Sequence, residues 1–368
     1  MKKVIAIAEF PAPYRVAVFE KISERYELTV YFNKNNDSTR DASYPINQMK
    51  FRHYFLDNQT GKKKFYYDIL TIKHFEFALV YNFAIKYGVI MFESALRKRI
   101  PIFINADGGF INKNYFKDKV KRHIVRNTDL YFSSGKAADN YFLFYGGKQD
   151  KVRHHRFTSL CQEDILSEPV TKAVKEQFKL ELGLIPKQKY AVAVGQFIER
   201  KGFDILLRAW GNLKCKQHLL LIGGGDLYEK YNQIICELDL TEYVSVIGFL
   251  PKNQLRRYLL ACDLFILPTR EDVWGLVINE AMAVGLPVIT TDQCVAGKEL
   301  IENDVNGYIV PVASTEELSR AIDRIFASSQ LAEAMAVQNI KKMQGCTMDQ
   351  IGVRHIEDID QYLRSRNA

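Results

Sequence analysis

Cysteine and histidine are scarce in this sequence, and neither is arranged in a pattern that binds a metal or forms a redox pair. The six cysteines are spread between Cys161 and Cys346, and no two form a Cys-x-x-Cys pair. The seven histidines also lack metal-site spacing. These absences speak against a disulfide framework and a zinc centre, and they predict reduced thiols in a cytoplasmic protein.

The sequence also lacks a long hydrophobic run. Its most apolar stretch, Phe77 to Phe92, is broken by Lys86 and is shorter than the roughly 20 residues that a membrane helix needs. We expect a buried strand and a helix there. The start, "MKKVIAIAEF", is interrupted by Glu9 and reads as a first strand rather than a signal peptide. The protein is expected to be soluble, or at most peripheral on the inner membrane face.

Positive charge predominates, with a net charge of +8 and an isoelectric point near 9.0. Such a balance favours anionic partners. Four basic clusters fall in the first half of the chain, at Lys62–Lys64, Arg97–Arg99, Lys117–Arg126 and Arg153–Arg156. No nucleic-acid-binding motif accompanies them, so we expect no nucleic-acid partner. Contact with an anionic membrane surface or a lipid-diphosphate acceptor is our interpretation, and simple solvation is the alternative.

Short apolar runs alternate with segments of helical length in two successive series. The first series comprises residues 4–8, 28–32, 77–81, 100–104 and 130–134, and the second 190–195, 218–223, 244–248, 264–268, 287–291 and 307–310. Near-continuous apolar strands at this spacing indicate parallel sheets covered on both faces. We therefore predict an α/β protein with two doubly wound domains, residues 1–168 and 169–349, with a helix of about 350–368 packing back on the first.

The loop after the first strand of the second domain carries cations. In "VGQFIERKGFDILLRAW", Gly195 ends the strand, Arg200 and Lys201 follow, and Gly202 opens a helix. Ligands of open parallel sheets bind beyond the carboxyl ends of the strands, and a helix N-terminus there attracts negative charge. We predict an anion site, with a solvated pair of charges as the alternative. The glycines of "LLIGGGDLYEKY", Gly223 to Gly225, repeat the pattern as a weaker signal.

The segment "TREDVWGLVINEAMAVG" places acids on both sides of a helix start. Asp272 lies in the loop, Gly275 begins the helix, and Glu280 lies inside it. Acids that flank a phosphate-binding helix start suit a ligand with hydroxyl groups at both ends and phosphates in the middle. A nucleotide sugar has this layout. The alternative is that the acids only favour the helix end electrostatically.

These segments, together with "VSVIGFLPKNQLRRYLLACDLFILPTRED", "VWGLVINEAMAVGLPVIT" and the early "FPAPYR", occur in an order that resembles a known family. The chain is similar to the retaining glycosyltransferases of the GT-B fold, in family four, also called group one. The resemblance spans nearly the whole chain and is strongest from Ala191 to Val310. It implies two Rossmann-like domains that face each other across a cleft.

The resemblance also implies roles for individual residues. Glu280 would bind the donor ribose, and Asp272, or its neighbour Glu271, would contact the transferred sugar. Lys201 and Arg200 would hold the diphosphate, although Gln196 stands where the family often has arginine. Besides these, the expected donor-binding residues are Gly195, Gly223, Gly224, Phe249, Leu250, Trp274, Gly275 and Leu276.

In the first domain, the resemblance points to the end of the strand that precedes "ADGGF". Many relatives have a reactive histidine there, and this chain has Asp107, followed by Gly108 and Gly109. Asp107 is a candidate base, orienting group or nucleophile, with a structural capping role as the alternative. Pro13 and Arg15 are expected to line the acceptor side of the cleft.

The predicted function is the transfer of a hexose from a UDP- or GDP-sugar to a glycan or lipid-linked acceptor in polysaccharide, lipopolysaccharide or glycolipid synthesis. Retention of configuration is implied by the resemblance alone. No metal or other cofactor is expected, because Arg200 and Lys201 can stabilise the leaving diphosphate and the one Asp-x-Asp string, Asp358 to Asp360, falls in a helical tail. The alternatives are a sugar-nucleotide epimerase of the same fold, or a basic membrane- or nucleic-acid-binding protein without transferase activity.

Overall fold

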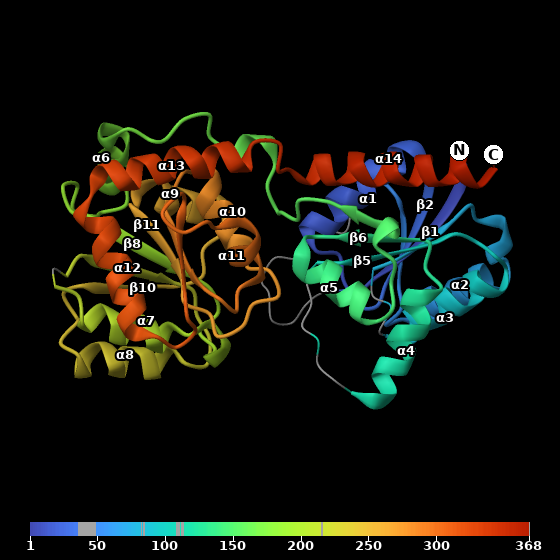
Figure 1. The fold of residues 1–368 in the computed structure, drawn as a ribbon, viewed down its shortest axis with the longest axis horizontal. Helices are drawn as coiled ribbons and strands as arrows, with labels where there is room; N and C mark the ends of the chain where they lie inside the picture. Colours follow the sequence, from blue (N-terminus) through green and yellow to red (C-terminus); the bar gives the residue numbers. More distant parts are fainter. Residues whose placement is uncertain are drawn as a thin grey trace. The chain divides into compact units, whose positions relative to one another are not determined.

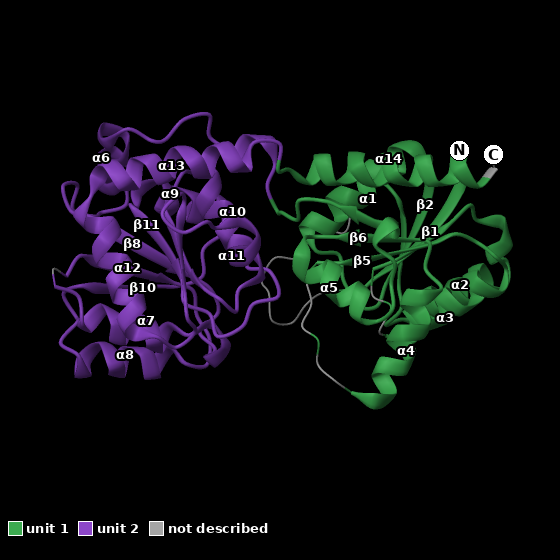
Figure 2. Cartoon of the chain, in the orientation of Figure 1, with its two compact units in different colours: residues 1–159, 346–368 green, residues 160–345 purple. Residues whose placement is uncertain are grey.

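The computed structural model describes residues 1–35, 49–81, 83, 85–107, 111, 114–214 and 216–367. The chain divides into two compact units (Figures 1 and 2): unit 1 comprises Met1–Ser159 and Cys346–Ala368, and unit 2 comprises Leu160–Gly345. The boundary after Ser159 lies before the one that was predicted after residue 168, because the segment between them forms hydrogen bonds with unit 2. The Asp164 carboxylate accepts a hydrogen bond from Lys252 at 2.6 Å, and the Leu166 N–H donates to the Ala283 carbonyl at 3.0 Å.

Unit 1 is built on a seven-stranded sheet whose described pairings are all parallel, in the order β3-β2-β1-β4-β5-β6-β7. Its strands are β1 (Lys3–Ala8), β2 (Glu27–Phe32), β3 (Arg52–Phe55), β4 (Ala78–Val80), β5 (Ile102–Ala106), β6 (Leu130–Ser133) and β7 (Val152–His154). Its helices are α1 (Pro13–Arg25), α2 (Gln59–Leu70), α3 (Lys86–Arg97), α4 (Tyr115–Arg126), α5 (Lys136–Phe144) and α14 (Met348–Asn367).

The expected run at residues 4–8 of unit 1 is buried on both faces of its sheet. Ile5 and Ile7 pack in a core with α3 and α5, whereas Val4 and Ala6 pack in a second core with α1 and α14. Because helices cover both faces, the strand is apolar throughout rather than alternating. The two strands missing from the prediction, β3 and β7, are the edges of the sheet. Their sequences, "RHYF" and "VRH", are short and polar because an edge strand is partly exposed.

The last helix, α14, packs against α1 within unit 1. A side-chain carbon at Gly352 would lie 2.5 Å from the Lys21 side chain, so the small residue lets the two helices approach closely. The acids of the Asp-x-Asp string contact different groups of unit 1. Asp358 pairs with Arg153 at 3.6 Å, and Asp360 pairs with Arg25 at 3.3 Å.

Unit 2 is built on a six-stranded sheet of parallel pairings, in the order β10-β9-β8-β11-β12-β13. Its strands are β8 (Tyr190–Val194), β9 (His218–Ile222), β10 (Val244–Ile247), β11 (Leu264–Leu267), β12 (Val288–Thr291) and β13 (Gly307–Val310). Its helices are α6 (Lys172–Glu181), α7 (Phe203–Gly211), α8 (Tyr228–Glu237), α9 (Lys252–Ala261), α10 (Leu276–Ala283), α11 (Val295–Leu300), α12 (Thr315–Ala327) and α13 (Ser329–Met343). The strand order reverses between β8 and β11.

Within the described part of the chain, no helix combines the length and the apolar character needed to cross a membrane. The stretch from Phe77 to Phe92 contributes β4 and most of α3, as its interruption by Lys86 predicts.

Candidate functional site

The cations and the first acid predicted for the donor site meet where the strand order of unit 2 reverses. Strands β8 and β11 are neighbours, and the loops after them carry Lys201 and Asp272. The Lys201 ammonium lies 2.5 Å from the Asp272 carboxylate, and both side chains are 12% exposed. Arg200 donates a hydrogen bond to the Glu271 carbonyl at 2.9 Å and lies 3.7 Å from Asp272. The Asp272 carboxylate thus lies between two cations where β8 and β11 end, which is the end at which open parallel sheets bind their ligands.

The loop with the two cations is held in place by its own backbone and by Arg270. Gly202 has a φ of 68°, and a side-chain carbon there would lie 2.2 Å from the Pro268 carbonyl oxygen, so only glycine fits without strain. The Arg270 guanidinium forms two hydrogen bonds with Asp204, at 2.9 and 2.8 Å. Burial alone would raise the pKa of Asp204, but the hydrogen bond and charge of Arg270 outweigh it and lower that pKa. The loop is therefore fixed before any ligand arrives.

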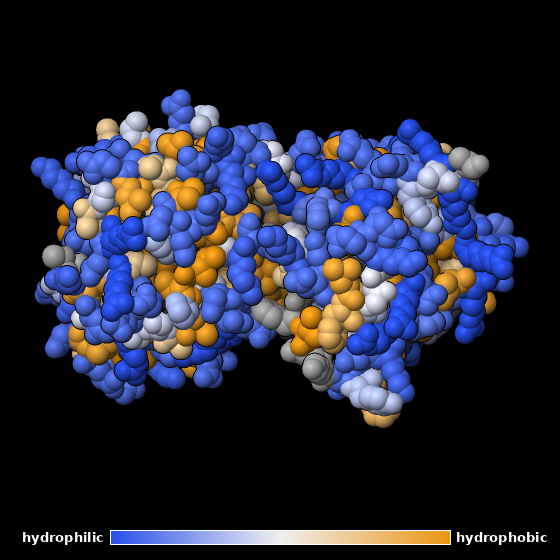
Figure 3. All heavy atoms as spheres, viewed as in Figure 1, coloured by the Kyte–Doolittle hydropathy of each residue, from blue (hydrophilic) through white to orange (hydrophobic). Residues whose placement is uncertain are grey.

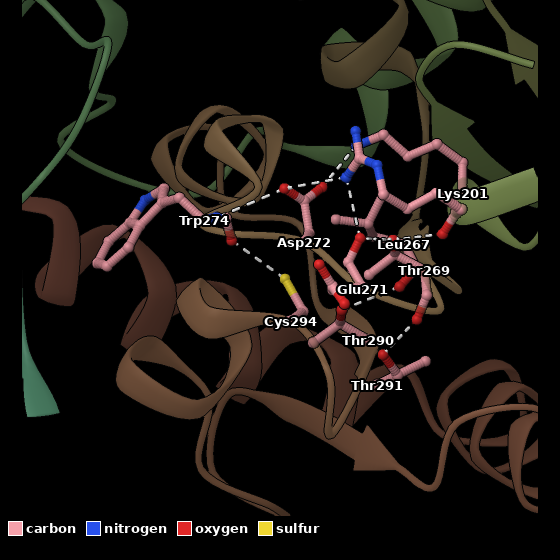
Figure 4. A network of polar contacts seen from close by, with 10 residues as sticks. Lys201, Leu267, Thr269, Glu271, Asp272, Trp274, Thr290, Thr291 and Cys294 are labelled. Atoms are coloured by element: carbon pink, nitrogen blue, oxygen red, sulfur yellow. Dashed lines mark hydrogen bonds and ion pairs between the residues drawn. The ribbon is translucent and has the colours of Figure 1, made fainter. Parts of the chain in front are cut away.

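The segment from Asp272 to Gly275 is bonded to the loop that follows β12. The Asp272 N–H donates to the Gln293 carbonyl at 2.9 Å, and the Val295 N–H donates to the Asp272 carbonyl at 3.1 Å. The thiol of Cys294 donates to the Trp274 carbonyl at 3.2 Å (Figure 4), and burial raises the pKa of this thiol to about 11. Cys294 is therefore a small packing group here and not a thiolate nucleophile.

Helix α10 begins directly beyond Asp272. Gly275 caps it with a φ of 93°, and Leu276 is its first residue, one position after the start predicted at Gly275. The indole of Trp274, by contrast, is 4% exposed and donates to the Asn279 side-chain oxygen at 2.9 Å. The Trp274 side chain thus belongs to the packed interior of unit 2, although it was expected among the donor-binding groups.

Glu280 lies on α10 and lines a cavity of about 270 Å³, counting space open to solvent. The other lining residues are Leu160, Asp164, Lys252, Leu255, Arg256, Leu259 and Val284. The basic residues of this cavity were not predicted. Lys252 lies two residues after Leu250, which was expected among the donor-binding residues, so its position at the start of α9 was the available signal. Arg256 is one helical turn further on, and its guanidinium donates to the Asp164 carbonyl at 2.9 Å.

The glycine run after β9 has a packing explanation. A side-chain carbon at Gly223 would lie 1.9 Å from the Gly195 carbonyl oxygen, and one at Gly225 would lie 2.9 Å from the Phe197 carbonyl oxygen. These glycines therefore let the loops after β8 and β9 approach each other. Gly224 faces the ring of Phe249, which is 58% exposed, whereas Leu250 and Gln196 are partly buried.

In unit 1, Asp107 lies at the carboxyl end of β5 and contacts Arg15. The Arg15 guanidinium donates to one Asp107 oxygen, the Asn105 amide donates to the other at 2.5 Å, and Arg15 also stacks 4.2 Å from the centre of the Tyr81 ring. Both carboxylate oxygens are thus engaged within unit 1. Pro13 is exposed in the first turn of α1. Gly108 and Gly109 lie outside the described residues.

Two buried histidines, which the sequence did not mark for any role, lie close to Arg15. His155 and His355 have ring centres 5.0 Å apart, and the His355 Nδ1 contacts the Ile351 carbonyl at 2.7 Å. Burial, together with the charge of Arg15, lowers the pKa of His155 to about 3. Burial also lowers the pKa of His355, so both rings are neutral at physiological pH.

Known proteins are similar to this chain in sequence and in fold. Residues 174–343 match the model of the family described as "Glycosyl transferases group 1". The matched residues lie within unit 2, which is therefore similar to the group 1 glycosyl transferases. An amylovoran biosynthesis glycosyltransferase of Erwinia amylovora is 32% identical over 161 residues, covering 41% of this chain and 39% of that protein. A lipopolysaccharide core biosynthesis glycosyltransferase of Rhizobium meliloti is 28% identical over 154 residues, covering 42% and 44%.

The group 1 match is thus carried by unit 2, and the matched segments span about two fifths of each curated relative's length. Similarity of fold extends further. The crystal structure of Anabaena HepE in complex with UDP aligns with a TM-score of 0.80 at 17% identity, over 98% of this chain and all of that one. The α/β architecture with two Rossmann-like domains is therefore confirmed as that of the GT-B glycosyltransferases.

Proposed function

We propose that this chain is a retaining glycosyltransferase that moves a hexose from a nucleotide diphosphate sugar to a glycan or lipid-linked acceptor in cell-envelope or polysaccharide synthesis. The observation that carries the proposal is the contact between Lys201 and Asp272 at the reversal of strand order, directly before α10. Support comes from the similarity of unit 2 to the group 1 glycosyl transferases and from the named roles of its relatives, which include lipopolysaccharide core biosynthesis.

The cations and the helix start would stabilise the leaving group. When the bond between sugar and phosphate breaks, negative charge grows on the diphosphate. Arg200, Lys201 and the first N–H groups of α10 offer positive charge at that place. Arg200 is held by the Glu271 carbonyl and Lys201 by the Asp272 carboxylate, so both cations are already positioned, which is the condition for strong electrostatic stabilisation. We therefore propose transfer without a divalent metal or other cofactor.

The two ends of the donor would lie on either side of this cluster. Glu280 would accept hydrogen bonds from the ribose hydroxyl groups, and Lys252 lines the cavity that Glu280 also lines. Phe249 and Leu250 would lie near the base. Relatives of the fold have been solved with UDP, which makes a uridine donor our first choice.

The adjacent acids Glu271 and Asp272 would act on the transferred sugar in different ways. Asp272 holds Lys201 and lies against the helix start, so it would orient both the cation and a sugar hydroxyl group. Glu271 has an exposed side chain and is the second candidate for the sugar contact. In unit 1, Asp107 is fixed by Arg15 and Asn105, and this favours a role as an orienting group over that of a free base.

We also propose that unit 1 attaches peripherally to an anionic membrane surface through α4. At the start of this helix Tyr115 is 69% exposed, Phe116 is 78% exposed and Val120 is 45% exposed, among several lysines. Figure 3 shows orange hydrophobic atoms beside strongly hydrophilic ones at this end of α4, at the lower edge of the view. Aromatic groups with neighbouring cations suit the headgroup region of an anionic bilayer.

Thermal unfolding with UDP, GDP and ADP tests the donor site. A ligand at 100 times its dissociation constant stabilises the native state by about 2.7 kcal/mol. We expect either UDP or GDP to raise the midpoint temperature of unfolding. Glu280→Ala should remove that rise and leave the midpoint temperature without ligand nearly unchanged. If no nucleotide raises the midpoint of the folded native chain, the acids only stabilise the helix end and the proposal is wrong.

A further inference from the structure

Unit 2 contains a second, larger cavity at the opposite ends of the strands. It encloses about 1200 Å³, counting space open to solvent, and it is bounded by α6, by the segment before β8, and by the region where α12 meets α13 (Figure 1). Lys189, Asp263 and Pro287 in its wall precede β8, β11 and β12. Lys201 and Asp272 follow β8 and β11, so this cavity and the Lys201–Asp272 cluster lie at different ends of the sheet.

The charged groups of this cavity are unbalanced. Its wall carries five lysines, Lys172, Lys175, Lys179, Lys187 and Lys189, against three carboxylates, Glu176, Asp263 and Glu333. The Asp263 carboxylate is shared by two ammonium groups, at 3.1 Å from Lys175 and 3.2 Å from Lys179, and Lys179 is 4% exposed. One carboxylate cannot neutralise two cations, so positive charge remains at the buried end.

The remaining lysines lie at the exposed part of the wall. Lys189 donates to the Phe326 carbonyl at 2.7 Å, which leaves its charge uncompensated. Among the described residues, Lys172 and Lys187 are exposed and form no ion pair within 4.0 Å. Burial alone would raise the pKa of Asp263, but the charges of Lys175 and Lys179 hold it below its ordinary value, so this carboxylate stays ionised.

Most of the other residues in the wall are apolar, although Gln188 and Ser329 are polar. Val170, Val284, Ile325 and Phe326 line it together with three prolines. A concave apolar surface with a few converging charges is typical of a small-molecule site. All of the cations are lysines, which act as compact point charges and commonly bind phosphate, whereas planar carboxylates are more often recognised by the forked arginine side chain.

We infer that this cavity is a second binding site, separate from the donor site, for a free phosphorylated organic molecule with an apolar part. Its phosphate would lie among Lys172, Lys175 and Lys187, and its apolar part against Ile325 and Phe326. Val284 lines both cavities of unit 2, so the experiment must separate binding here from binding at the donor site.

Fluorescence titration with 1-naphthyl phosphate tests the inference, with 1-naphthol and inorganic phosphate as probes of the apolar part and the charge alone. We expect naphthyl phosphate to bind more tightly than either fragment. Replacing Lys172 and Lys187 together by alanine should weaken it roughly threefold to tenfold, as expected for two exposed charges. Lys341→Ala, an exposed lysine on α13 outside the cavity wall, is the matched control and should change nothing.

Lys201→Met separates the two sites, and it should bind naphthyl phosphate as the native chain does. Equal binding by the native chain and the double lysine variant would overturn the inference, and so would loss of binding in Lys201→Met. Co-sedimentation with vesicles of phosphatidylglycerol and phosphatidylcholine distinguishes a lipid source. If the double variant lost vesicle binding while naphthyl phosphate did not bind the native chain, a lipid headgroup would be the occupant and the inference would be wrong.

Discussion

Lys201→Met and Asp272→Asn should change nucleotide binding in opposite directions if the cluster before α10 holds a diphosphate. Methionine keeps most of the length of the lysine side chain and removes its charge. The Asp272 carboxylate, 12% exposed, would then keep the Arg200 guanidinium at 3.7 Å and the Trp274 N–H at 3.4 Å. Asparagine at position 272 does the reverse, because it removes the carboxylate and leaves both cations for the ligand.

The expected magnitudes follow from these contacts. A hydrogen bond between charged groups contributes about 1.5 to 3 kcal/mol, so Lys201→Met should raise the dissociation constant of UDP by roughly ten- to a hundredfold. Asp272→Asn should leave that constant unchanged or lower it by up to about tenfold, because a neighbouring negative charge is gone. Each single variant should also lower the free energy of unfolding by roughly 2 kcal/mol, and the double variant by less than the sum.

Isothermal titration calorimetry with UDP measures the first effect, and urea unfolding of the four chains measures the second. The reasoning fails if Lys201→Met binds UDP as tightly as the native chain. It also fails if Asp272→Asn weakens the binding of UDP as much as Lys201→Met does, because the ion pair would then stabilise the fold without contacting the ligand.

Three further outcomes are expected. Gly202→Ala should lower the free energy of unfolding by about 2 to 4 kcal/mol, because its methyl group would overlap the Pro268 carbonyl oxygen. Gly183 also has a positive φ, of 71°, but open space around it, so Gly183→Ala should lower the same free energy by only about 1 kcal/mol in urea unfolding. His155 is neutral in the folded chain, where its pKa is about 3, against 6.5 in the unfolded chain. Its contribution to the free energy of unfolding is therefore fully present above pH 6.5 and falls by roughly 2 kcal/mol by pH 5. His155→Asn should flatten the dependence of the free energy of unfolding on pH. Phe116→Ser should reduce co-sedimentation with anionic vesicles several-fold. Leu180 of unit 2 is similarly exposed, and Leu180→Ser should leave co-sedimentation unchanged. Equal effects of the two substitutions would show that α4 is not the membrane contact.

The fold was predictable wherever a strand is covered on both faces. Runs such as residues 4–8 and 264–268 are apolar throughout because helices bury both of their sides, and this pattern is local in the sequence. The edge strands β3 and β7 were not predicted, because their partial exposure to solvent removes the continuous apolar run. The division between the units was placed too late, because the polar segment from Asp164 to Leu166 gives no local sign of its hydrogen bonds to Lys252 and Ala283.

At the site, the sequence predicted which residues would meet but not what each would contact. The loops with Lys201 and Asp272 follow strands that the doubly wound order makes neighbours, so their encounter follows from topology. The indole of Trp274 was misplaced because its partner, Asn279, lies on the next helix and carries no motif. The pairing of Asp107 with Arg15 joins the end of β5 to the first turn of α1, which are distant in sequence, and no periodicity reports such a contact.

The central claim, that the chain transfers a sugar, is tested most directly by following labelled sugar from UDP-glucose and GDP-mannose into the lipid and polysaccharide fractions of cell envelopes. The account predicts that adding the native chain moves label from one donor into one fraction, and that Asp272→Asn binds the nucleotide but moves at least tenfold less label. If the native chain binds the nucleotide and yet adds no label beyond that of the envelopes alone, the chain is a nucleotide-binding protein and the claim is contradicted.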